Sequence, residues 1–174
     1  TEKKLTSKRG RRSAGEYKAQ LTEKQKARFT YGLSEKQFSN YVKKARTKKG
    51  ISPAVALTGL LESRLDNTAF RLGLVKSRLA ARQAVTHGHI WVNGRRVNVP
   101  SYTVRVGDNI MVRVESRNSG LFRDLDERLK EYTTPAWLAF DTEKWTGVVT
   151  ALPQVLAGES NLNFGSILEF YSRV

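Results

Sequence analysis

The chain has 174 residues, a formal net charge of +15 and no cysteine. This length accommodates one or two small domains, and the missing cysteine excludes disulfides and thiolate metal sites. There is no run of 18 apolar residues and no segment resembling a secretory signal, so we expect neither a membrane span nor secretion. The chain begins at Thr1 rather than Met, which leaves open whether residues precede it.

The positive charge is concentrated toward the start of the chain. Residues 1–49 contain 16 lysines and arginines against 4 acidic residues (+12), residues 50–114 contain 9 against 3 (+6), and residues 115–174 contain 6 against 9 (−3). Such an excess on one part of a chain indicates a polyanionic partner. A membrane surface is a weaker candidate, because no amphipathic helix with a large exposed apolar face accompanies the charge.

Residues 1–15 contain too few apolar side chains to fold alone. We expect a basic arm that becomes ordered against phosphates, with a solvated disordered tail as the alternative. Its cations are Lys8, Arg9, Arg11 and Arg12.

Residues 16–60 are predicted to form a helical domain. Two helices should be separated near Tyr31-Gly32, and Ser34 with Gln37 has the pattern of a capping box at the start of the second. The second helix has an apolar stripe and a face dense in lysine, which repels itself unless an anion neutralises it. The stripe contains Phe38, Tyr41, Val42 and Ala45, and the basic face includes Lys36, Lys43 and Lys44.

A third helix is expected to start at Ser52-Pro53 and to run without a break to Gly73. Leu61, Leu65, Thr68 and Leu72 would form its buried stripe, and Arg64, Asn67 and Arg71 a second stripe facing outward. Asp66 beside Arg64 is interpreted as an ion-pair partner that orients the arginine, and not as a catalytic acid.

A fourth helix should run from its N-cap Ser77 to Gly88 with Arg78 and Arg82 facing out together. Strands 90–92 and 96–97 then flank Asn93-Gly94, the strongest short hairpin signal. Residues 102–106 and 110–114 alternate like two further strands around a turn at Gly107-Asp108. The pattern therefore predicts two helices on a small antiparallel sheet with the arginines outside.

Residues 115–162 are predicted to extend this domain by an acidic helix and a β-hairpin, with strands at 137–140 and 145–150. Trp137 and Trp145 are interpreted as packing residues in preference to base-stacking ones. A last helix should begin at a capping box of Ser166 and Glu169. Its apolar face would contain Ile167, Phe170 and Tyr171.

Several short segments carry a family resemblance. Residues 61–114 closely resemble the small RNA-binding domain named after the fourth protein of the small ribosomal subunit. The matching segments are Glu62-Ser63-Arg64-Leu65-Asp66-Asn67, Arg71-Leu72-Gly73, Arg82-Gln83, His87-Gly88-His89-Ile90, Val92-Asn93-Gly94-Arg95 and Pro100-Ser101-Tyr102. Segments 21–29, 31–37 and 167–173 resemble the helical domain of that ribosomal protein family itself. The sequence of residues 29–33 is similar to that of cyanobacterial and plastid members.

The resemblance implies an α+β fold in which the last helix, residues 163–174, returns to the helical domain and residues 61–114 are an insertion. It further implies a structural, non-enzymatic protein that binds small-subunit ribosomal RNA early in assembly. Its place would be near where messenger RNA enters the subunit and beside the third and fifth small-subunit proteins, with an influence on translational accuracy. We expect a ribosome of the chloroplast stroma, with the bacterial cytoplasm as the alternative, and no membrane association or homo-oligomer. A free-standing RNA-binding regulator, or an accessory to an RNA-modifying enzyme, uses the same domain and remains an alternative function.

The candidate RNA contacts are positively charged or hydrogen-bonding side chains, which can position a folded RNA by its phosphates and shape. In the inserted domain they are Arg64, Asn67, Arg71, Arg78, Arg82, His87, His89, Asn93, Arg95 and Arg96. In the arm and helical domain they are Lys8, Arg9, Arg11, Arg12, Lys24, Lys26, Arg28, Lys36, Lys43 and Lys44. We expect no cofactor and no metal, because two histidines without cysteine lack partners for a tetrahedral zinc site.

Overall fold

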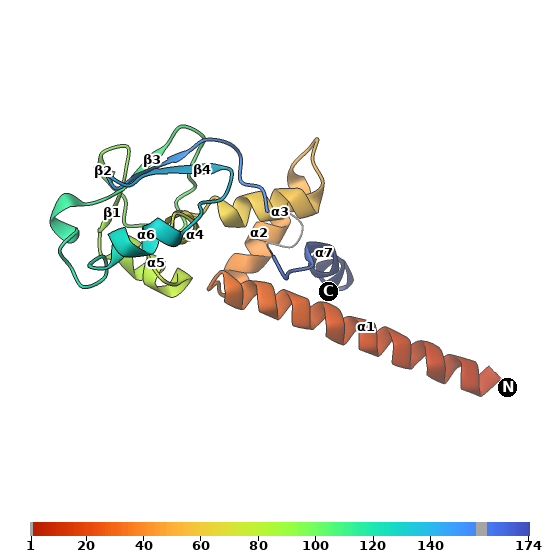
Figure 1. Cartoon of the computed structure of the whole chain (residues 1–174). Helices are drawn as coiled ribbons and strands as arrows, with labels where there is room; N and C mark the ends of the chain where they lie inside the picture. The colour runs from red at the N-terminus through yellow and green to blue at the C-terminus, as the bar shows by residue number, and fades with distance from the viewer. Residues whose placement is uncertain (1, 156–159) are drawn as a thin grey trace. The chain divides into compact units, whose positions relative to one another are not determined.

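The computed structural model describes the backbone of residues 2–155 and 160–174, and side chains from residue 13 onward within those ranges. The chain folds as two compact units (Figure 1). Unit 1 consists of Thr1–Leu57 together with Val155–Val174, and unit 2 of Thr58–Gln154. Unit 2 is therefore an insertion within unit 1, and each unit is described by itself below.

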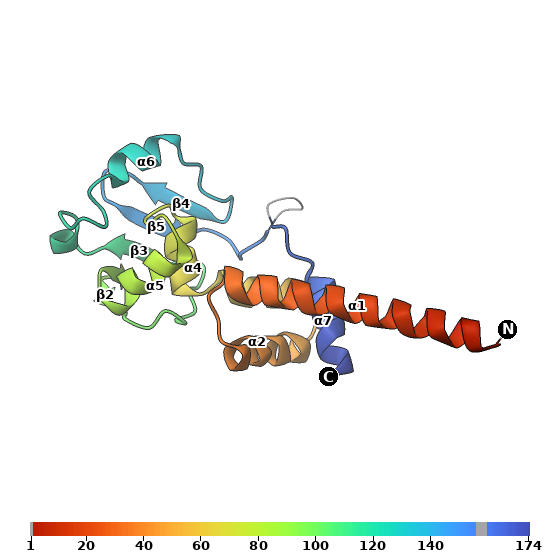
Figure 2. The ribbon, with the colours of Figure 1, turned by 90° about the horizontal axis from the view of Figure 1, so that it is seen from below.

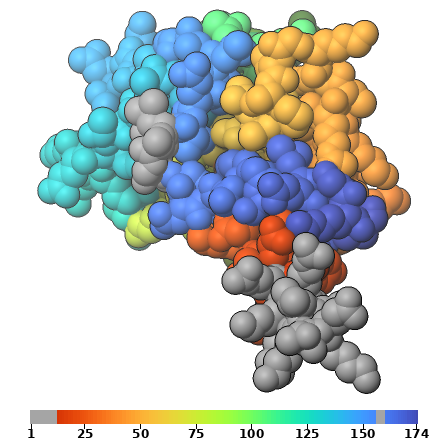
Figure 3. Space-filling view, turned by 90° about the vertical axis from the view of Figure 1, so that its right-hand side faces the viewer, coloured from red at the N-terminus to blue at the C-terminus, as the bar shows by residue number. Residues whose placement is uncertain are grey.

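Unit 1 is helical. It contains α1 (Glu2–Thr30), α2 (Glu35–Thr47), the start of α3 (Pro53–Glu62) and α7 (Phe164–Arg173). The C-terminal helix α7 packs against α1 and crosses it at a steep angle (Figure 1, Figure 2 and Figure 3). The predicted return of the last helix to the helical domain is confirmed. Its core contains Ala27, Phe38, Val42, Ala45, Ile167 and Phe170.

The starts of three helices in unit 1 can be compared with the capping residues predicted from the sequence. Ser34 caps α2 in the predicted capping box with Gln37, and Ser52 accepts from the backbone N–H of Val55 at the start of α3. The predicted box of Ser166 and Glu169 is wrong: Asn163 is the N-cap of α7, and its side chain accepts from the Ser166 N–H at 3.0 Å. The prediction that residues 1–15 form a separate arm is also wrong for the backbone, because α1 is continuous from Glu2.

Unit 2 places short helices on an antiparallel sheet, with the strand order β2-β1-β3-β5-β4. The strands are β1 (Ile90–Val92), β2 (Arg95–Arg96), β3 (Asn109–Val112), β4 (Leu138–Asp141) and β5 (Thr146–Val149). The helices are the end of α3, α4 (Leu65–Arg71), α5 (Arg78–Thr86), the 3₁₀ turn η1 (Val114–Ser116) and α6 (Leu125–Glu131). Two of the three predicted hairpins are present, those of β1 with β2 and of β4 with β5. Asn93 and Gly94 turn the first with φ of 51° and 75°.

The core of unit 2 lies between the sheet and the helices. Ile90, Val92, Ile110 and Val112 alternate inward from β1 and β3 and are 3% exposed or less. Trp137 is buried in this core and Trp145 packs against it, as predicted for a packing role. The α+β class, with a helical domain and an inserted domain of helices on an antiparallel sheet, is confirmed.

Two predicted elements of unit 2 differ from the structure. The helix expected from residue 53 to Gly73 is broken between α3 and α4, because Arg64 is extended (φ −65°, ψ 139°) and pairs with Thr103 in an isolated antiparallel bridge. That bridge is also all that forms of the strand expected over 102–106. Within the residues that the structure describes, no helix is long and apolar enough to cross a membrane.

Candidate nucleic-acid interface

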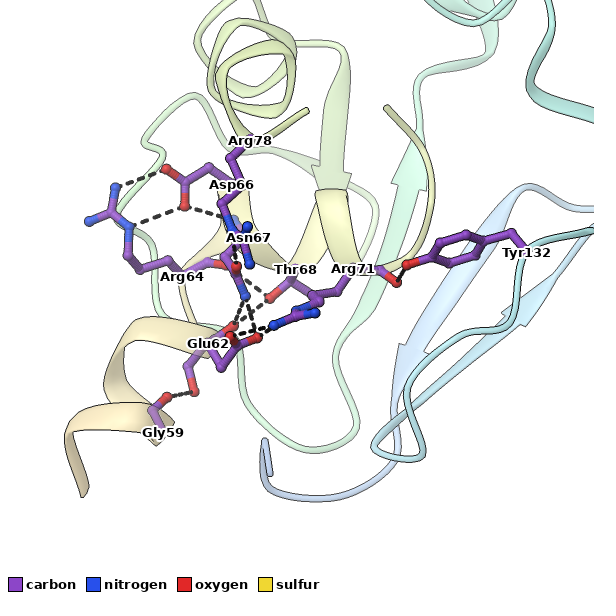
Figure 4. Close-up of polar contacts among 10 residues, drawn as sticks. Gly59, Glu62, Arg64, Asp66, Asn67, Thr68, Arg71, Arg78 and Tyr132 are labelled. Carbon is purple, nitrogen blue, oxygen red and sulfur yellow. Dashed lines mark hydrogen bonds and ion pairs between the residues drawn. The ribbon is translucent and has the colours of Figure 1, made fainter. Parts of the chain in front are cut away.

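A buried carboxylate lies at the centre of the site in unit 2. Glu62 is the last residue of α3, and its side chain is 0% exposed. Arg71 donates to both of its oxygens, from Nε to Oε2 and from Nη2 to Oε1, each at 2.9 Å (Figure 4). Asn67 Nδ2 donates to Glu62 Oε2 at 2.7 Å and to the Glu62 backbone carbonyl at 3.0 Å. The break after α3 lets the carboxylate turn back onto α4.

A second arginine joins this network from the next helix. Arg78, at the start of α5, donates from Nε to Asn67 Oδ1 at 2.9 Å (Figure 4). Its guanidinium also lies over the Phe70 ring, 4.5 Å from the centroid, a cation–π geometry. Arg71 and Arg78 are thus linked through Glu62 and Asn67. The prediction that arginines of two consecutive helices come together is confirmed for this pair.

Arg64 does not join the network that links Arg71 and Arg78. Its side chain is 2% exposed and pairs with Asp66, from Nη2 to Oδ2 at 2.9 Å and from Nε to Oδ1 at 3.1 Å. The predicted ion pair is confirmed, but the expectation that Arg64 and Asn67 face outward is wrong, since Asn67 is 1% exposed. The extended backbone at Arg64 turns its side chain inward, so Arg64, Asp66 and Asn67 hold the α3–α4 junction.

A second group of cationic and imidazole side chains lies where α5 ends and β1 begins. The His87 and His89 ring centroids are 6.1 Å apart, and His89 Nδ1 lies 2.7 Å from Ser116 Oγ. Arg96 folds against Gly88, where an added Cβ would come within 2.3 Å of its Nε; Gly88 also has φ of +77°. Burial, followed by the positive charges of His87, Arg113 and Arg96, lowers the pKa of His89.

The β1–β2 hairpin contributes an exposed arginine and a structural asparagine. Arg95 is exposed on β2. Asn93 donates to Asp108 Oδ1 at 2.9 Å and accepts from the Asn109 N–H at 2.9 Å. The Asn93 side chain therefore ties the hairpin to the start of β3.

The candidate residues of unit 1 fall into two kinds. Lys24 is 5% exposed, forms an ion pair with Glu35 at 2.7 Å and lies over the Phe170 ring, so it holds the helices together. Arg28 is also partly engaged, donating to Gln25 Oε1 at 2.9 Å. By contrast, four other candidate lysines are exposed, namely Lys26, Lys36, Lys43 and Lys44, and Lys26 also donates to the Asn161 backbone carbonyl at 2.5 Å. The side chains of Lys8, Arg9, Arg11 and Arg12 lie outside the described residues.

Three contributing residues were not predicted. Glu62 lies nine positions before Arg71, which in an unbroken helix is about two and a half turns and puts the two side chains on opposite faces. The pair could therefore not be inferred from periodicity. Phe70 lies in α4 among apolar residues, so nothing in the sequence indicated that its ring would lie under the Arg78 guanidinium. Arg113 precedes η1 and donates its backbone N–H to the His89 carbonyl at 2.8 Å, which places it beside the histidines.

These features are suited to binding anions rather than to catalysis. Arginine presents a planar set of N–H donors that matches phosphate oxygens, and here two such groups are held by fixed partners. Aromatic and imidazole side chains beside them can contact ribose and bases.

The comparisons with known proteins agree with this description. Residues 2–62 match the family described as the Ribosomal protein S4/S9 N-terminal domain, and residues 63–110 match the S4 domain. The border between the two matches falls at the break between α3 and α4.

Similar relatives are each named small ribosomal subunit protein uS4. The protein of Syntrophomonas wolfei is 48% identical over 163 residues, covering 94% of this chain and 78% of the relative. That of Roseiflexus castenholzii is 48% identical over 165 residues (94% and 80%), and that of Thermus thermophilus 49% identical over 166 residues (95% and 78%). With both family domains present in order and this identity over nearly its whole length, the chain belongs to the uS4 family of small ribosomal subunit proteins.

Proposed function

We propose that this protein is a structural, non-enzymatic component of the small ribosomal subunit that binds the subunit's RNA. The observation that carries the proposal is the linkage of Arg71 and Arg78 through Glu62 and Asn67, which fixes two guanidinium groups from consecutive helices. Arg82 follows Arg78 by one turn, and Arg95 and Arg96 lie on the adjoining hairpin. The RNA would be recognised by phosphate position and shape, since A-form grooves hide base identity from side chains.

The contacts we propose in unit 2 are Arg71, Arg78, Arg82, His87, Arg95 and Arg96. Arg64 and Asn67 are left out because they are buried, and His89 and Asn93 are given supporting roles because their side chains bond within the unit. In unit 1 we propose Lys26, Arg28, Lys36, Lys43 and Lys44, with Lys24 left out for its burial. Contacts by Lys8, Arg9, Arg11 and Arg12 stay a prediction that the charge of residues 1–49 supports.

The finer role is proposed from the family resemblance. The protein would bind early in subunit assembly, beside the third and fifth small-subunit proteins and near incoming messenger RNA. Crosslinking within intact subunits tests these neighbours. A bacterial cytoplasmic location is supported by the bacterial source of the three relatives described above. The plastid location expected from residues 29–33 stays a prediction.

The binding experiment compares two double charge reversals of equal net change. Arg82→Glu with Arg95→Glu removes proposed contacts, whereas Arg105→Glu with Lys130→Glu changes exposed residues outside them. Each lost charge-assisted contact is worth about 1.5 kcal/mol, so the first variant should bind small-subunit RNA about a hundredfold more weakly. The second should lose much less, with thermal unfolding unchanged in both. If the control pair proves equally damaging, this surface is not the binding site.

The salt dependence of binding tests the electrostatic part of the proposal. Neutralising roughly six to ten phosphates makes the logarithm of the affinity fall steeply and linearly with the logarithm of the salt concentration. An affinity that barely changes with salt would contradict recognition through phosphates.

A further inference from the structure

We infer that Glu62 is a positioning residue for RNA binding, which holds Arg71 directly and Arg78 through Asn67 in the orientation that meets the RNA. The inference rests on the proposed function and deepens it, because it assigns an RNA-binding role to a negatively charged residue. Glu62 itself is 0% exposed and cannot touch the RNA in this structure.

The burial of Glu62 requires compensation, and the compensation comes from the binding surface. A buried carboxylate is tolerated only when it is paired and hydrogen-bonded. Glu62 obtains this from the Arg71 guanidinium and the Asn67 amide, while the Arg71 side chain keeps 20% of its area exposed. One side of Arg71 is therefore fixed in the interior and the residue still reaches the surface.

The geometry of the pair fixes orientation as well as position. Two parallel N–H···O bonds of 2.9 Å set the plane of the Arg71 guanidinium, which a single bond would leave free to rotate. Asn67 uses its amide nitrogen on Glu62, so its Oδ1 is turned toward Arg78 and accepts the 2.9 Å bond from Arg78 Nε. One carboxylate thus sets the direction of cations on α4 and α5.

Charge and positioning make opposite predictions for the loss of this carboxylate. Removing a negative charge raises the net charge of the protein by one, which by itself strengthens binding to any RNA. Loss of positioning weakens binding to the specific RNA only, because phosphate contacts that fix orientation depend on where each cation points. The sign of the change in specific affinity therefore separates the two.

The test compares Glu62→Gln with Glu127→Gln in the full chain. Both make the same charge change, and Glu127 is an exposed residue of α6. The measurements are the dissociation constants for small-subunit RNA and for poly(U) at one salt concentration, with tryptophan fluorescence to follow unfolding of unit 2. We expect Glu62→Gln to bind small-subunit RNA at least about tenfold more weakly while poly(U) binding does not fall. Glu127→Gln should weaken neither.

The inference is overturned if Glu62→Gln folds and binds small-subunit RNA as tightly as the unaltered chain. If Glu62→Gln loses affinity equally for small-subunit RNA and for poly(U), the role of Glu62 is purely structural and the inference is again overturned. If Glu62→Gln does not fold, Arg71→Lys decides: it keeps the charge but not the paired N–H donors, and undiminished specific binding by it overturns the inference. If neither variant folds, Glu62 is structural and the positioning role is withdrawn. Failure of the unaltered chain to bind small-subunit RNA would instead refute the proposed function.

Discussion

The buried pair of Arg64 and Asp66 offers the sharpest test of how unit 2 is held together. We consider the isosteric change Asp66→Asn, which leaves the Arg64 guanidinium in place, 2% exposed and without its carboxylate. An arginine stays charged in a protein interior, so it cannot relieve the loss by giving up its proton. The same change weakens the acceptor for the Asn67 N–H, now 2.7 Å from Asp66 Oδ1.

The size of the effect follows from the burial of both partners. Removing one member of a buried ion pair costs about 3–5 kcal/mol. In a domain of roughly 100 residues, each kcal/mol lowers the unfolding midpoint by about 4–8 °C. We therefore expect Asp66→Asn to lower the midpoint of unit 2 by at least about 12 °C, with exposed Glu127→Gln as a control that leaves it unchanged.

Tryptophan fluorescence is the assay of choice because all three tryptophans, Trp91, Trp137 and Trp145, belong to unit 2. Thermal unfolding followed this way is not confused with unfolding of the helical unit. A double variant, Arg64→Met with Asp66→Asn, should recover part of the loss, since it no longer buries an unpaired charge. A drop of less than about 4 °C for Asp66→Asn would refute the reasoning, because it would place the pair below about 1 kcal/mol.

Three further predictions concern pH and packing. Burial alone would raise the pKa of Glu35, but the Lys24 hydrogen bond and the other partners of the carboxylate lower it, so unit 1 should lose stability as pH falls below 4.5. In Glu35→Gln, the melting temperature measured by circular dichroism should therefore depend less on pH in that range. Burial and neighbouring cations lower the pKa of His89, so its contribution to the stability of unit 2 is present above pH 6.5 and is lost as pH falls from there through the folded pKa. In His89→Gln, the thermal unfolding midpoint measured by tryptophan fluorescence should no longer show that dependence. Gly147→Ala would put a Cβ 2.6 Å from both Cδ atoms of fully buried Leu72. The free energy of unfolding from a denaturant titration should fall by about 1–3 kcal/mol, and an unchanged value would show that Leu72 can move aside.

Elements with their own local signals could be predicted from the sequence. The α2 cap at Ser34, the Asn93-Gly94 hairpin and the helix start at Ser77 each depend on a few neighbouring residues, and each is where the sequence places it. The hairpin of β4 and β5 followed from alternation around a polar turn. Its addition to β3, which makes one five-stranded sheet, did not follow, because strand partners distant in sequence leave no local pattern.

The candidate site was predictable in its cations but not in its arrangement. An unbroken helix over residues 53–72 was the simplest reading of the apolar spacing, and it put Arg64 on the outside. The structure breaks that helix because Leu65 and Asp66 donate their backbone N–H groups to Tyr102 and Pro100, about 35 residues later. No local pattern announces such contacts, and without them neither the inward Arg64 nor the buried Glu62 can be inferred.

The insertion of unit 2 between the two segments of unit 1 has a consequence for how the chain folds as it is synthesised. Unit 2 ends at Gln154, so all of its strands emerge from the ribosome that makes them before α7 does. The helical unit must wait, because Ile167 and Phe170 of α7 fill its core and Arg46 donates to the α7 backbone at Leu168, 2.7 Å away. During that interval the apolar faces of α1 and α2 lack their last partner. A chain released before residue 164 should therefore carry a folded sheet domain beside helices that recruit chaperones.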